Sequence, residues 1–139
     1  MQVKDIMTVA PVCISDAATL KDAHLLMQNR GVRHLPVIGE TDGQYKGVLT
    51  HKKMVSTLVT VLNKYGQGGL DRKERMTSVA ELMDKDSDTI SDDEPLTVVV
   101  DFFIDNKLGC LPVLGQDRKV IGIVTSSDFV KLCKRLLQI

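Results

Sequence analysis

Two kinds of apolar spacing follow one another along the chain and predict its secondary structure. Apolar residues at helical spacing are typical of a helix with one buried face, and short continuous apolar runs are typical of buried strands. In the first half of the chain these runs predict a helical turn over residues 3–8, a strand over 11–14, a helix closed by Gly31, strands over 32–38 and 45–50, and a helix over 51–64.

The two longer predicted helices each carry an apolar face. The residues expected to face inward are Leu20, Ala23, Leu26 and Met27 in the first helix, and Met54, Val55, Leu58, Val59 and Leu62 in the second. Gly31 stands where a left-handed residue commonly ends a helix. Residues 40–43 carry the polar residues and the glycine of a turn between the two strands.

The same order of blocks restarts after residue 76, so the chain contains an internal repeat. The matching segments are 3–7 with 79–83, 14–16 with 90–92, 35–37 with 111–113, and 47–50 with 122–125. Order, spacing and residue type agree over nearly the whole chain. Each repeat is therefore predicted to be a β-α-β-β-α unit preceded by a short helical segment.

The repeat divides the chain into residues 1–64, a linker over 65–76 that is rich in glycine and then in charge, and residues 77–139. The linker glycines match neither a dinucleotide-binding motif nor a P-loop. A unit of about 60 residues with three short strands buries a modest core. We therefore expect an α/β fold in which the two units pack sheet to sheet about a pseudo-twofold axis. Such an axis would create two related clefts outside the ends of the strands.

Composition and charge narrow the classes of function. The chain has 139 residues, is 43% hydrophobic and 26% charged, and carries 18 basic and 18 acidic residues. This balance lacks the basic footprint of a nucleic-acid-binding protein. No apolar run has the length of a membrane span or the form of a signal peptide. Three cysteines without a C-x-x-C motif favour a reducing, cytoplasmic location.

The stretch over residues 122–128 is where the sequence points to binding chemistry. An apolar strand runs into Thr125, and Asp128 opens the next helix after Ser127. Hydroxyl groups and backbone amides at a helix N-terminus suit a phosphate. A carboxylate in the first turn can accept hydrogen bonds from a ribose diol. The alternative interpretation is an ordinary strand end followed by a helix cap.

These motifs together resemble a tandem pair of cystathionine-β-synthase (CBS) domains, also called a Bateman module. The residues that carry the resemblance are 5–8 with 81–83, 33–37 (RHLPV) with 110–113 (CLPV), and 47–50 with 122–128. It covers roughly residues 1–62 and 77–137. The resemblance implies a regulatory module that binds an adenosine-containing ligand, signals to a partner protein and commonly forms a homodimer. The ligand implied is AMP, ADP or ATP, with S-adenosylmethionine less favoured.

The resemblance also assigns the residues of one complete nucleotide site. Asp128 is expected to bind the ribose diol, and Thr125 and Ser127 are expected to bind phosphate or ribose. The residues expected to surround the base are Met7, Thr8, Val12, Val32, Arg33, His34 and Pro36. Arg33 and His34 are the nearest candidates to offset phosphate charge, with a solvated surface pair as the alternative interpretation.

The second cleft departs from the family pattern. In the first repeat Lys53 holds the position of Asp128, and an ammonium group has no acceptor for a diol. Thr50 is retained, whereas Cys110 stands where the other cleft has His34. This degenerate cleft is either vestigial or retuned for an anion. The asymmetry predicts one nucleotide per chain.

No arrangement of residues indicates catalysis, a catalytic cofactor or a metal site, so the chain is expected not to be an enzyme. The acidic residues between 84 and 94 lack the glycine turn of a calcium loop.

Two functions remain open. One is a regulatory sensor of an adenine nucleotide with an unknown partner protein. The other is a dimerisation or interaction module without a physiological nucleotide, built on the apolar helices over 54–62 and 129–137.

Overall fold

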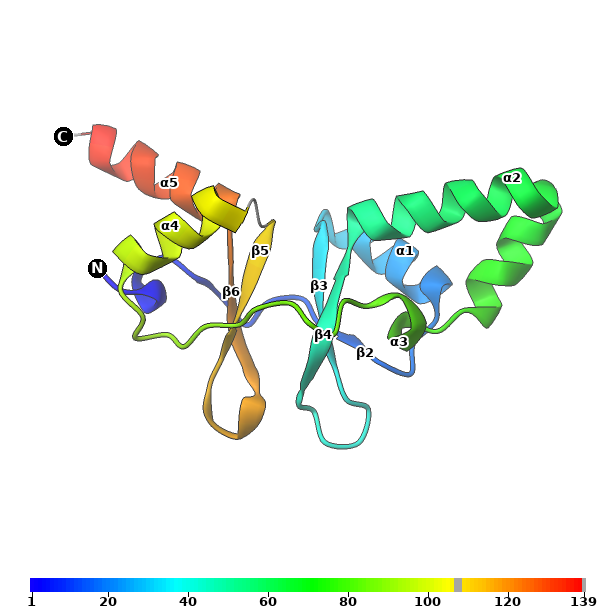
Figure 1. The fold of residues 1–139 in the computed structure, drawn as a ribbon, viewed down its shortest axis with the longest axis horizontal. Coiled ribbons are helices and arrows are strands. Elements are labelled where there is room, and N and C mark those ends of the chain that lie inside the picture. The colour runs from blue at the N-terminus through cyan, green and yellow to red at the C-terminus, as the bar shows by residue number, and fades with distance from the viewer. Residues whose placement is uncertain (107–108, 139) are drawn as a thin grey trace. The chain divides into compact units, whose positions relative to one another are not determined.

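The chain folds into two compact units (Figure 1). The structure is a computed structural model that describes residues 1–106 and 109–138. Unit 1 comprises Met1–Pro11 and Asp88–Ile139, and unit 2 comprises Val12–Ser87. Each unit combines a three-stranded sheet with helices, which confirms the predicted mixed α/β class. The predicted packing of one sheet against the other stays a prediction.

Unit 2 contains the first sheet, with the strand order β2-β3-β4. Its elements are β2 (Ile14–Ser15), α1 (Leu20–Arg30), β3 (His34–Ile38), β4 (Tyr45–Thr50), α2 (His51–Met76) and α3 (Val79–Leu82). Strand β2 is parallel to β3, and β3 is antiparallel to β4. The predicted strand over 45–50 is confirmed. The strands predicted over 11–14 and 32–38 are shorter than expected, because only Ile14–Ser15 and His34–Ile38 have sheet partners.

Unit 1 contains the second sheet, with the strand order β1-β6-β5. Its elements are the 3-10 turn η1 (Val3–Asp5), β1 (Thr8–Val9), α4 (Leu96–Asn106), β5 (Cys110–Leu114), the 3-10 turn η2 (Gln116–Arg118), β6 (Val120–Thr125) and α5 (Ser126–Leu137). Strand β1 is absent from the sequence prediction, because two residues are too short for a periodic signal. Ile90, expected within a strand, makes only an isolated bridge to Val113.

The two hairpins confirm the internal repeat at the level of register. In β3 and β4, Leu35 lies opposite Leu49, and in β5 and β6, Leu111 lies opposite Val124. Both hairpins also have a register irregularity at the same place, after Val37 and after Val113. Because equivalent residues occupy equivalent pairs, the duplication extends from the sequence to the sheet hydrogen bonds.

The short segment that precedes each repeat packs in the unit built mainly by the other repeat. In unit 1, Val3 N–H donates to Glu94 O at 2.9 Å, and β1 pairs with β6. In unit 2, Val79 N–H donates to Ala18 O at 2.8 Å, and Asp84 pairs with Val48. The compact units therefore differ from the sequence repeats. The boundaries predicted over 1–64, 65–76 and 77–139 stay a prediction about the duplication.

Each unit has its own apolar core. The buried cluster of unit 2 is Ile14, Leu20, Ala23, Met27, Leu35, Val37, Leu49, Met54 and Val79. The buried cluster of unit 1 is Val3, Leu96, Val99, Leu111, Val113 and Val124. Val3 and Val79, from the exchanged segments, are each 0% exposed, so each segment completes a core. None of the helices in the described residues is both long and apolar enough to span a membrane.

Helix α1 follows its prediction closely. Thr19 caps its N-terminus, and Asp22 returns a hydrogen bond to Thr19 N–H at 3.0 Å. Gly31 ends the helix with φ of 64°, in the left-handed region that glycine adopts without a steric penalty. Leu20, Ala23 and Met27 are buried as predicted, and Leu26 packs at the edge of the same core.

Helix α2 differs from the prediction in length. Residues 65–76, expected to be a glycine-rich linker, lie within α2, although Gly66 interrupts the helical geometry with φ of 72° and ψ of −177°. Figure 1 shows α2 turning back beyond its midpoint. Its last turns contact α1, where Lys21 Nζ lies 3.7 Å from Glu74 Oε2. The glycines correctly indicated that the helix is interrupted, and the interruption is at Gly66. The contact of Glu74 with α1 keeps the residues after it helical.

The predicted inner face of α2 is mostly on the surface. Met54 is buried and Leu58 packs at the core edge. Val55, Val59 and Leu62 are 40%, 50% and 42% exposed, so the expectation that they face inward was wrong. Helical spacing identifies an apolar face but not what covers it. We name these three residues the α2 stripe.

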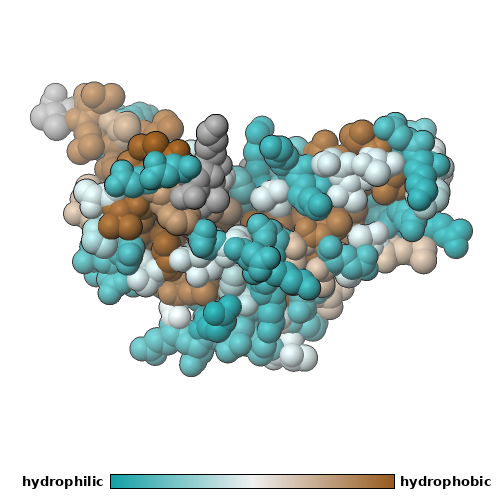
Figure 2. All heavy atoms as spheres, in the orientation of Figure 1, coloured by the Kyte–Doolittle hydropathy of each residue, from teal (hydrophilic) through white to brown (hydrophobic). Residues whose placement is uncertain are grey.

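The helices of unit 1 also combine buried and exposed apolar residues. Phe103 of α4 and Phe129 of α5 meet edge to face, with ring centroids 5.4 Å apart. Val130 and Leu136 of α5 are exposed, as is Ile104 of α4. Figure 2 shows hydrophobic side chains gathered over α4 and α5.

Candidate functional site

Asp128 lies at the N-terminus of α5, directly after β6, and its side chain is held on two sides. The residue is 5% exposed. Thr125 N–H donates to Asp128 Oδ2 at 2.8 Å, in a capping box whose N-cap is Thr125. Thr8 Oγ1 of β1 donates to Asp128 Oδ1 at 3.1 Å. The structure thus brings Thr8, Thr125 and Asp128 together within unit 1.

Both interpretations of Asp128 are chemically compatible. Each carboxylate oxygen has two lone pairs. Oδ2 also accepts from Thr125 Oγ1 at 3.4 Å, whereas the single bond from Thr8 leaves Oδ1 capacity for another donor. The cap and the bond to Thr8 hold the carboxylate in one orientation. Asp128 can therefore cap α5 and still accept a hydrogen bond at Oδ1, and a second at Oδ2 where a ligand hydroxyl takes the place of the Thr125 hydroxyl.

A pocket of about 240 Å³ lies beside Asp128 in unit 1. It is lined by Asp5 and Ile6 near η1 and, on one face of α5, by Asp128, Lys131, Leu132 and Arg135. Sequence reasoning missed Lys131 and Arg135, although their positions three and seven residues after Asp128 place them on its helix face. The pocket thus holds two cations beside the carboxylates of Asp5 and Asp128, and the cations are the groups in it that can pair with an anion.

The remaining predicted residues of unit 1 lie around the same strands. Met7 precedes β1, and a Cβ atom built on Gly122 would stand 2.6 Å from Met7 Sδ. Ser127 is exposed in the first turn of α5. Cys110 lies opposite Thr125 in the sheet, and burial raises the pKa of its thiol to about 12. A thiol with such a pKa stays protonated at neutral pH and is a poor nucleophile.

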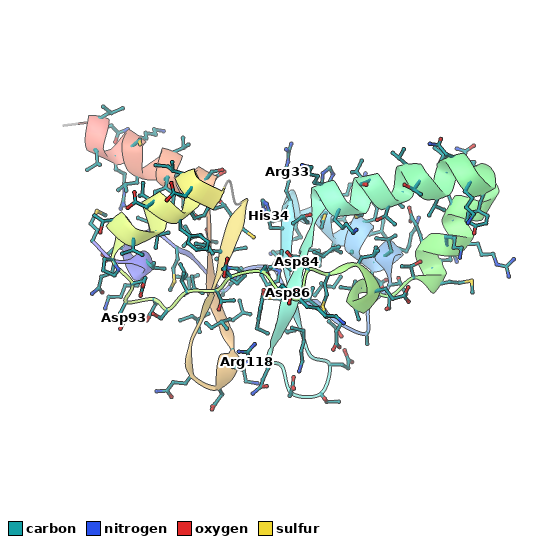
Figure 3. The ribbon with its side chains drawn as sticks, viewed as in Figure 1. Arg33, His34, Asp84, Asp86, Asp93 and Arg118 are labelled. Atoms are coloured by element: carbon teal, nitrogen blue, oxygen red, sulfur yellow. The ribbon has the colours of Figure 1, made fainter. Side chains whose placement is uncertain are left out.

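The predicted residues of unit 2 separate into core and surface positions. Pro36 is fully buried, whereas Val32 and Val12 pack at the edge of the core. Arg33 and His34 lie at one end of β3 (Figure 3). The proline therefore serves the core of unit 2, whereas Arg33 and His34 together line a pocket.

That pocket, of about 560 Å³, carries four basic side chains. It is lined by Arg33, His34, Thr50, His51, Lys52, Val55 and Ser56. His34 lies opposite Thr50 in the sheet, and His51 N–H donates to Arg33 O at 2.8 Å. The structure thus groups Arg33 and His34 with Thr50, which the sequence assigned to the degenerate cleft. Burial, and then the charge of Arg33, lower the pKa of His34.

In the degenerate cleft Thr50 still caps its helix, but a positive Lys53 stands at the position of the negative Asp128. Lys53 N–H donates to Thr50 Oγ1 at 3.1 Å, as expected of a residue in the first helical turn, but the Lys53 side chain is exposed. Asp84 pairs with Val48 in the place where Thr8 pairs with Ile123 in unit 1. The hydroxyl of Thr8 and the carboxylate of Asp128 in unit 1 thus correspond to the carboxylate of Asp84 and the ammonium group of Lys53 in unit 2.

The acidic stretch after α3 does not gather into a metal site. Figure 3 shows Asp84, Asp86 and Asp93, and Asp84 Oδ1 accepts from Asp86 N–H at 2.9 Å. Over residues 1–106 and 109–138, no three His, Cys, Asp or Glu side chains lie close enough to hold a metal ion. In the described structure Asp84 and Asp93 instead accept hydrogen bonds from residues two positions away in the sequence.

The family model for the CBS domain matches the chain twice, over residues 3–60 and 79–135. The chain belongs to the CBS domain family. The two matches form a tandem CBS pair, in agreement with the resemblance carried by the sequence motifs. A CBS domain-containing protein of Dictyostelium discoideum is 28% identical over 137 residues, with 98% of this chain and 93% of that protein covered.

Solved CBS pairs share the fold. A Vibrio cholerae protein described as a candidate acetoin utilization protein, AcuB, superposes with a TM-score of 0.85 at 26% identity, covering 99% of this chain and 95% of that one. CBSX2 in complex with AMP gives 0.79 at 26% identity and covers 97% of each chain. The CBS domain pair of protein MJ0100, in complex with 5′-methylthioadenosine and S-adenosyl-L-methionine, gives 0.77 at 25% identity and covers 96% of each chain.

Some relatives are much longer than this chain. A Methanosalsum zhilinae protein named homoserine O-acetyltransferase is 28% identical over 130 residues, but this CBS pair spans only 23% of it. The pair spans 46% of the Methanocaldococcus jannaschii protein MJ1225. The matched part is in each case the length of a CBS pair, so the enzyme name belongs to a protein with a large further portion.

Proposed function

We propose that this CBS pair is a regulatory module that binds an adenine nucleotide at Asp128 and transmits the binding event to a partner protein. The observation that carries the proposal is the buried Asp128 carboxylate, oriented by Thr8 and Thr125 beside a pocket with two cations. A carboxylate held in one orientation loses little further entropy when it accepts the hydrogen bonds of a diol.

The ribose is the common element of the ligands seen in related pairs. AMP is bound in CBSX2, and 5′-methylthioadenosine and S-adenosyl-L-methionine are bound in MJ0100. All three contain adenosine, whose ribose carries the diol proposed to meet Asp128. Asp128 therefore favours ligands that carry a ribose, and other groups must recognise the adenine base and choose among its derivatives.

Charge favours a phosphate-bearing ligand among the members of this class. Lys131 and Arg135 line the pocket at Asp128, and Thr125 and Ser127 lie at the N-terminus of α5. Cations and a helix N-terminus attract phosphate, whereas Asp5 and Asp128 are the groups in this pocket that would attract the sulfonium of S-adenosylmethionine. We therefore propose AMP, ADP or ATP. Contributions to base and phosphate binding from Met7, and from the unit 2 residues Val12, Val32, Arg33, His34 and Pro36, stay predictions.

The proposal is tested by calorimetric and thermal-shift titration with AMP, ADP, ATP and S-adenosylmethionine. A ligand at 100 times its dissociation constant should stabilise the native state by about 2.7 kcal/mol, which raises the unfolding midpoint. Because Lys53 replaces the second diol acceptor, we expect one nucleotide per chain. Two equivalent sites per chain would contradict that stoichiometry, and no response to any of the four ligands would overturn the proposed function.

A second candidate function is favoured by the α2 stripe. Val55, Val59 and Leu62 expose an apolar face on one helix, and such faces mark association surfaces. We propose that the stripe forms a homodimer interface, which a regulatory module also accommodates. A dimer in sedimentation equilibrium, together with no nucleotide response, would favour a purely interacting module.

The pKa of His34 gives a pH-dependent test of its predicted role. Burial and Arg33 place this pKa below its ordinary value of 6.5, so the unliganded residue is neutral at pH 7. A phosphate beside His34 would raise the pKa, so binding would take up a proton and affinity would increase as the pH falls below 7. In calorimetric titrations between pH 5.5 and 7.5 we expect His34→Gln to lose part of this dependence. Identical pH profiles for both proteins would remove His34 from the site.

A further inference from the structure

The part of α2 after Gly66 lies outside both matches of the CBS-domain family model. The family matches end at residue 60 and resume at residue 79, whereas α2 continues to Met76. We name residues 67–76 the α2 arm. These residues are helical although they lie outside both family matches, so their helical structure needs a physical explanation.

The arm is anchored to α1 through a buried charge. Glu74 is 4% exposed, and its Oε1 lies 3.3 Å from His24 Nδ1. Its Oε2 lies 3.7 Å from Lys21 Nζ and has no hydrogen-bond partner among the described residues. Burial of a carboxylate is costly unless it is paired, so Glu74 fixes one position of the arm on α1. The opposite side of the arm is thereby held outward.

That outward side contains an apolar hollow. A pocket of about 340 Å³ is lined by Tyr65, Gly69, Arg72, Lys73 and Met76. Tyr65 and Met76 are 47% and 67% exposed. A Cβ atom built on Gly69 would stand 2.3 Å from Tyr65 Cβ, so the absence of a side chain at Gly69 allows Tyr65 to lie against the helix.

Cations without acidic partners surround the hollow. Lys64 Nζ and Lys73 Nζ each lie 5.3 Å from the centre of the Tyr65 ring. Asp71 pairs with Arg75 at 3.3 Å and with Lys21 at 3.8 Å, and Glu74 faces α1. Within the described residues, Lys64, Arg72 and Lys73 make no ion pair. The hollow therefore offers apolar contact at its centre and uncompensated positive charge at its rim.

We propose that the α2 arm is the docking site for an acidic segment of a partner protein, which inserts one apolar side chain between Tyr65 and Met76. Carboxylates that flank this side chain meet Lys64, Arg72 and Lys73. An apolar anchor with a charged rim is how small interfaces obtain both affinity and specificity. The inference rests on the proposed function, because it gives the chemistry of the partner that a regulatory module requires.

A pair of synthetic peptides tests the proposal. Both consist of alternating Asp and Glu, one with a central Phe and the other with Ala in its place, and each carries a fluorophore for anisotropy titration with the full chain. Burial of the Phe side chain should make the first peptide bind at least about tenfold more tightly. Added salt should weaken both peptides.

Variants of the arm locate the binding. The double change Arg72→Glu with Lys73→Glu should lower the affinity for the Phe peptide by about tenfold or more. Lys134→Glu, an exposed charge reversal on α5, is the matched control and should leave it unchanged. Tyr65→Ala removes one wall of the hollow that receives the peptide Phe. Tyr65 is exposed and uncharged, so the change should abolish the preference for Phe over Ala without altering the charge of the arm.

Three results would overturn the proposal. They are equal affinity for the two peptides, equal loss in the Lys134→Glu control, and tighter binding of an oligonucleotide or of anionic vesicles that survives Tyr65→Ala. Nucleotide titration of the arm variants is measured separately. In the wild-type chain, retained nucleotide binding with no binding of the Phe peptide refutes the docking site alone, and the reverse refutes the nucleotide proposal alone. In the arm variants, the proposal expects nucleotide binding to be retained.

Discussion

Replacement of Asp128 by Asn should weaken adenine-nucleotide binding by roughly ten- to a hundredfold, since hydrogen bonds to charged groups contribute about 1.5–3 kcal/mol. The amide keeps the shape of the side chain but replaces one acceptor oxygen with a donor, and it removes the negative charge. A diol that donates two hydrogen bonds then meets a donor. Calorimetric titration of both proteins with the ligand identified for the wild type measures the loss.

The same substitution should also destabilise the fold, because Asp128 caps α5. Loss of a helix cap costs about 1 kcal/mol. Asp22→Asn is the matched control: Asp22 Oδ2 accepts from Thr19 N–H at 3.0 Å in a capping box of the same type at the start of α1. We expect Asp22→Asn to lower stability comparably and to leave nucleotide affinity unchanged. Equal losses of affinity in both variants would mean that binding follows helix stability, and wild-type affinity in Asp128→Asn would remove Asp128 from the site.

Gly122→Ala should destabilise the protein by about 1–3 kcal/mol, the range for an added methyl group in a tightly packed interior. A Cβ atom at this position would stand 2.6 Å from Met7 Sδ and 3.1 Å from Thr8 O. Gly122 pairs with Val9 where β1 joins β6, so relief of the clash must move β1. Because β1 carries the hydroxyl that orients Asp128, we expect nucleotide binding to weaken as well.

Urea unfolding of Gly122→Ala and of a matched variant, Gly68→Ala, checks this prediction. A Cβ atom at Gly68 would meet nothing within 4 Å, and Gly68 lies within α2. Alanine there should therefore stabilise the helix by up to about 1 kcal/mol. Wild-type stability in Gly122→Ala would show that Met7 and β1 adapt without cost, and would remove the argument that close approach requires glycine at this position.

Much of the candidate site was predictable from local sequence. A strand that ends at Thr125 and a helix that begins beside it follow from the change of apolar period, and Asp128 follows from its place in the first turn. The bond from Thr8 to Asp128 joins residues 120 positions apart, so it depends on the pairing of β1 with β6. Lys131 and Arg135 belong to the site only because η1 lies near their helix face.

The sequence by itself determined the duplication, both β-hairpins, the end of α1 at Gly31 and the asymmetry between Asp128 and Lys53. These features rest on short-range spacing, turn chemistry and residue identity, which act over a few neighbouring positions.

The tertiary structure alone decided three other features. It placed residues 1–11 in the unit of the second repeat, it kept the α2 arm helical by burying Glu74 against α1, and it left Val55, Val59 and Leu62 exposed. Each of these depends on which distant surface covers an apolar or charged side chain. Periodicity reveals that such a face exists, but the burial that stabilises it is a property of the assembled fold.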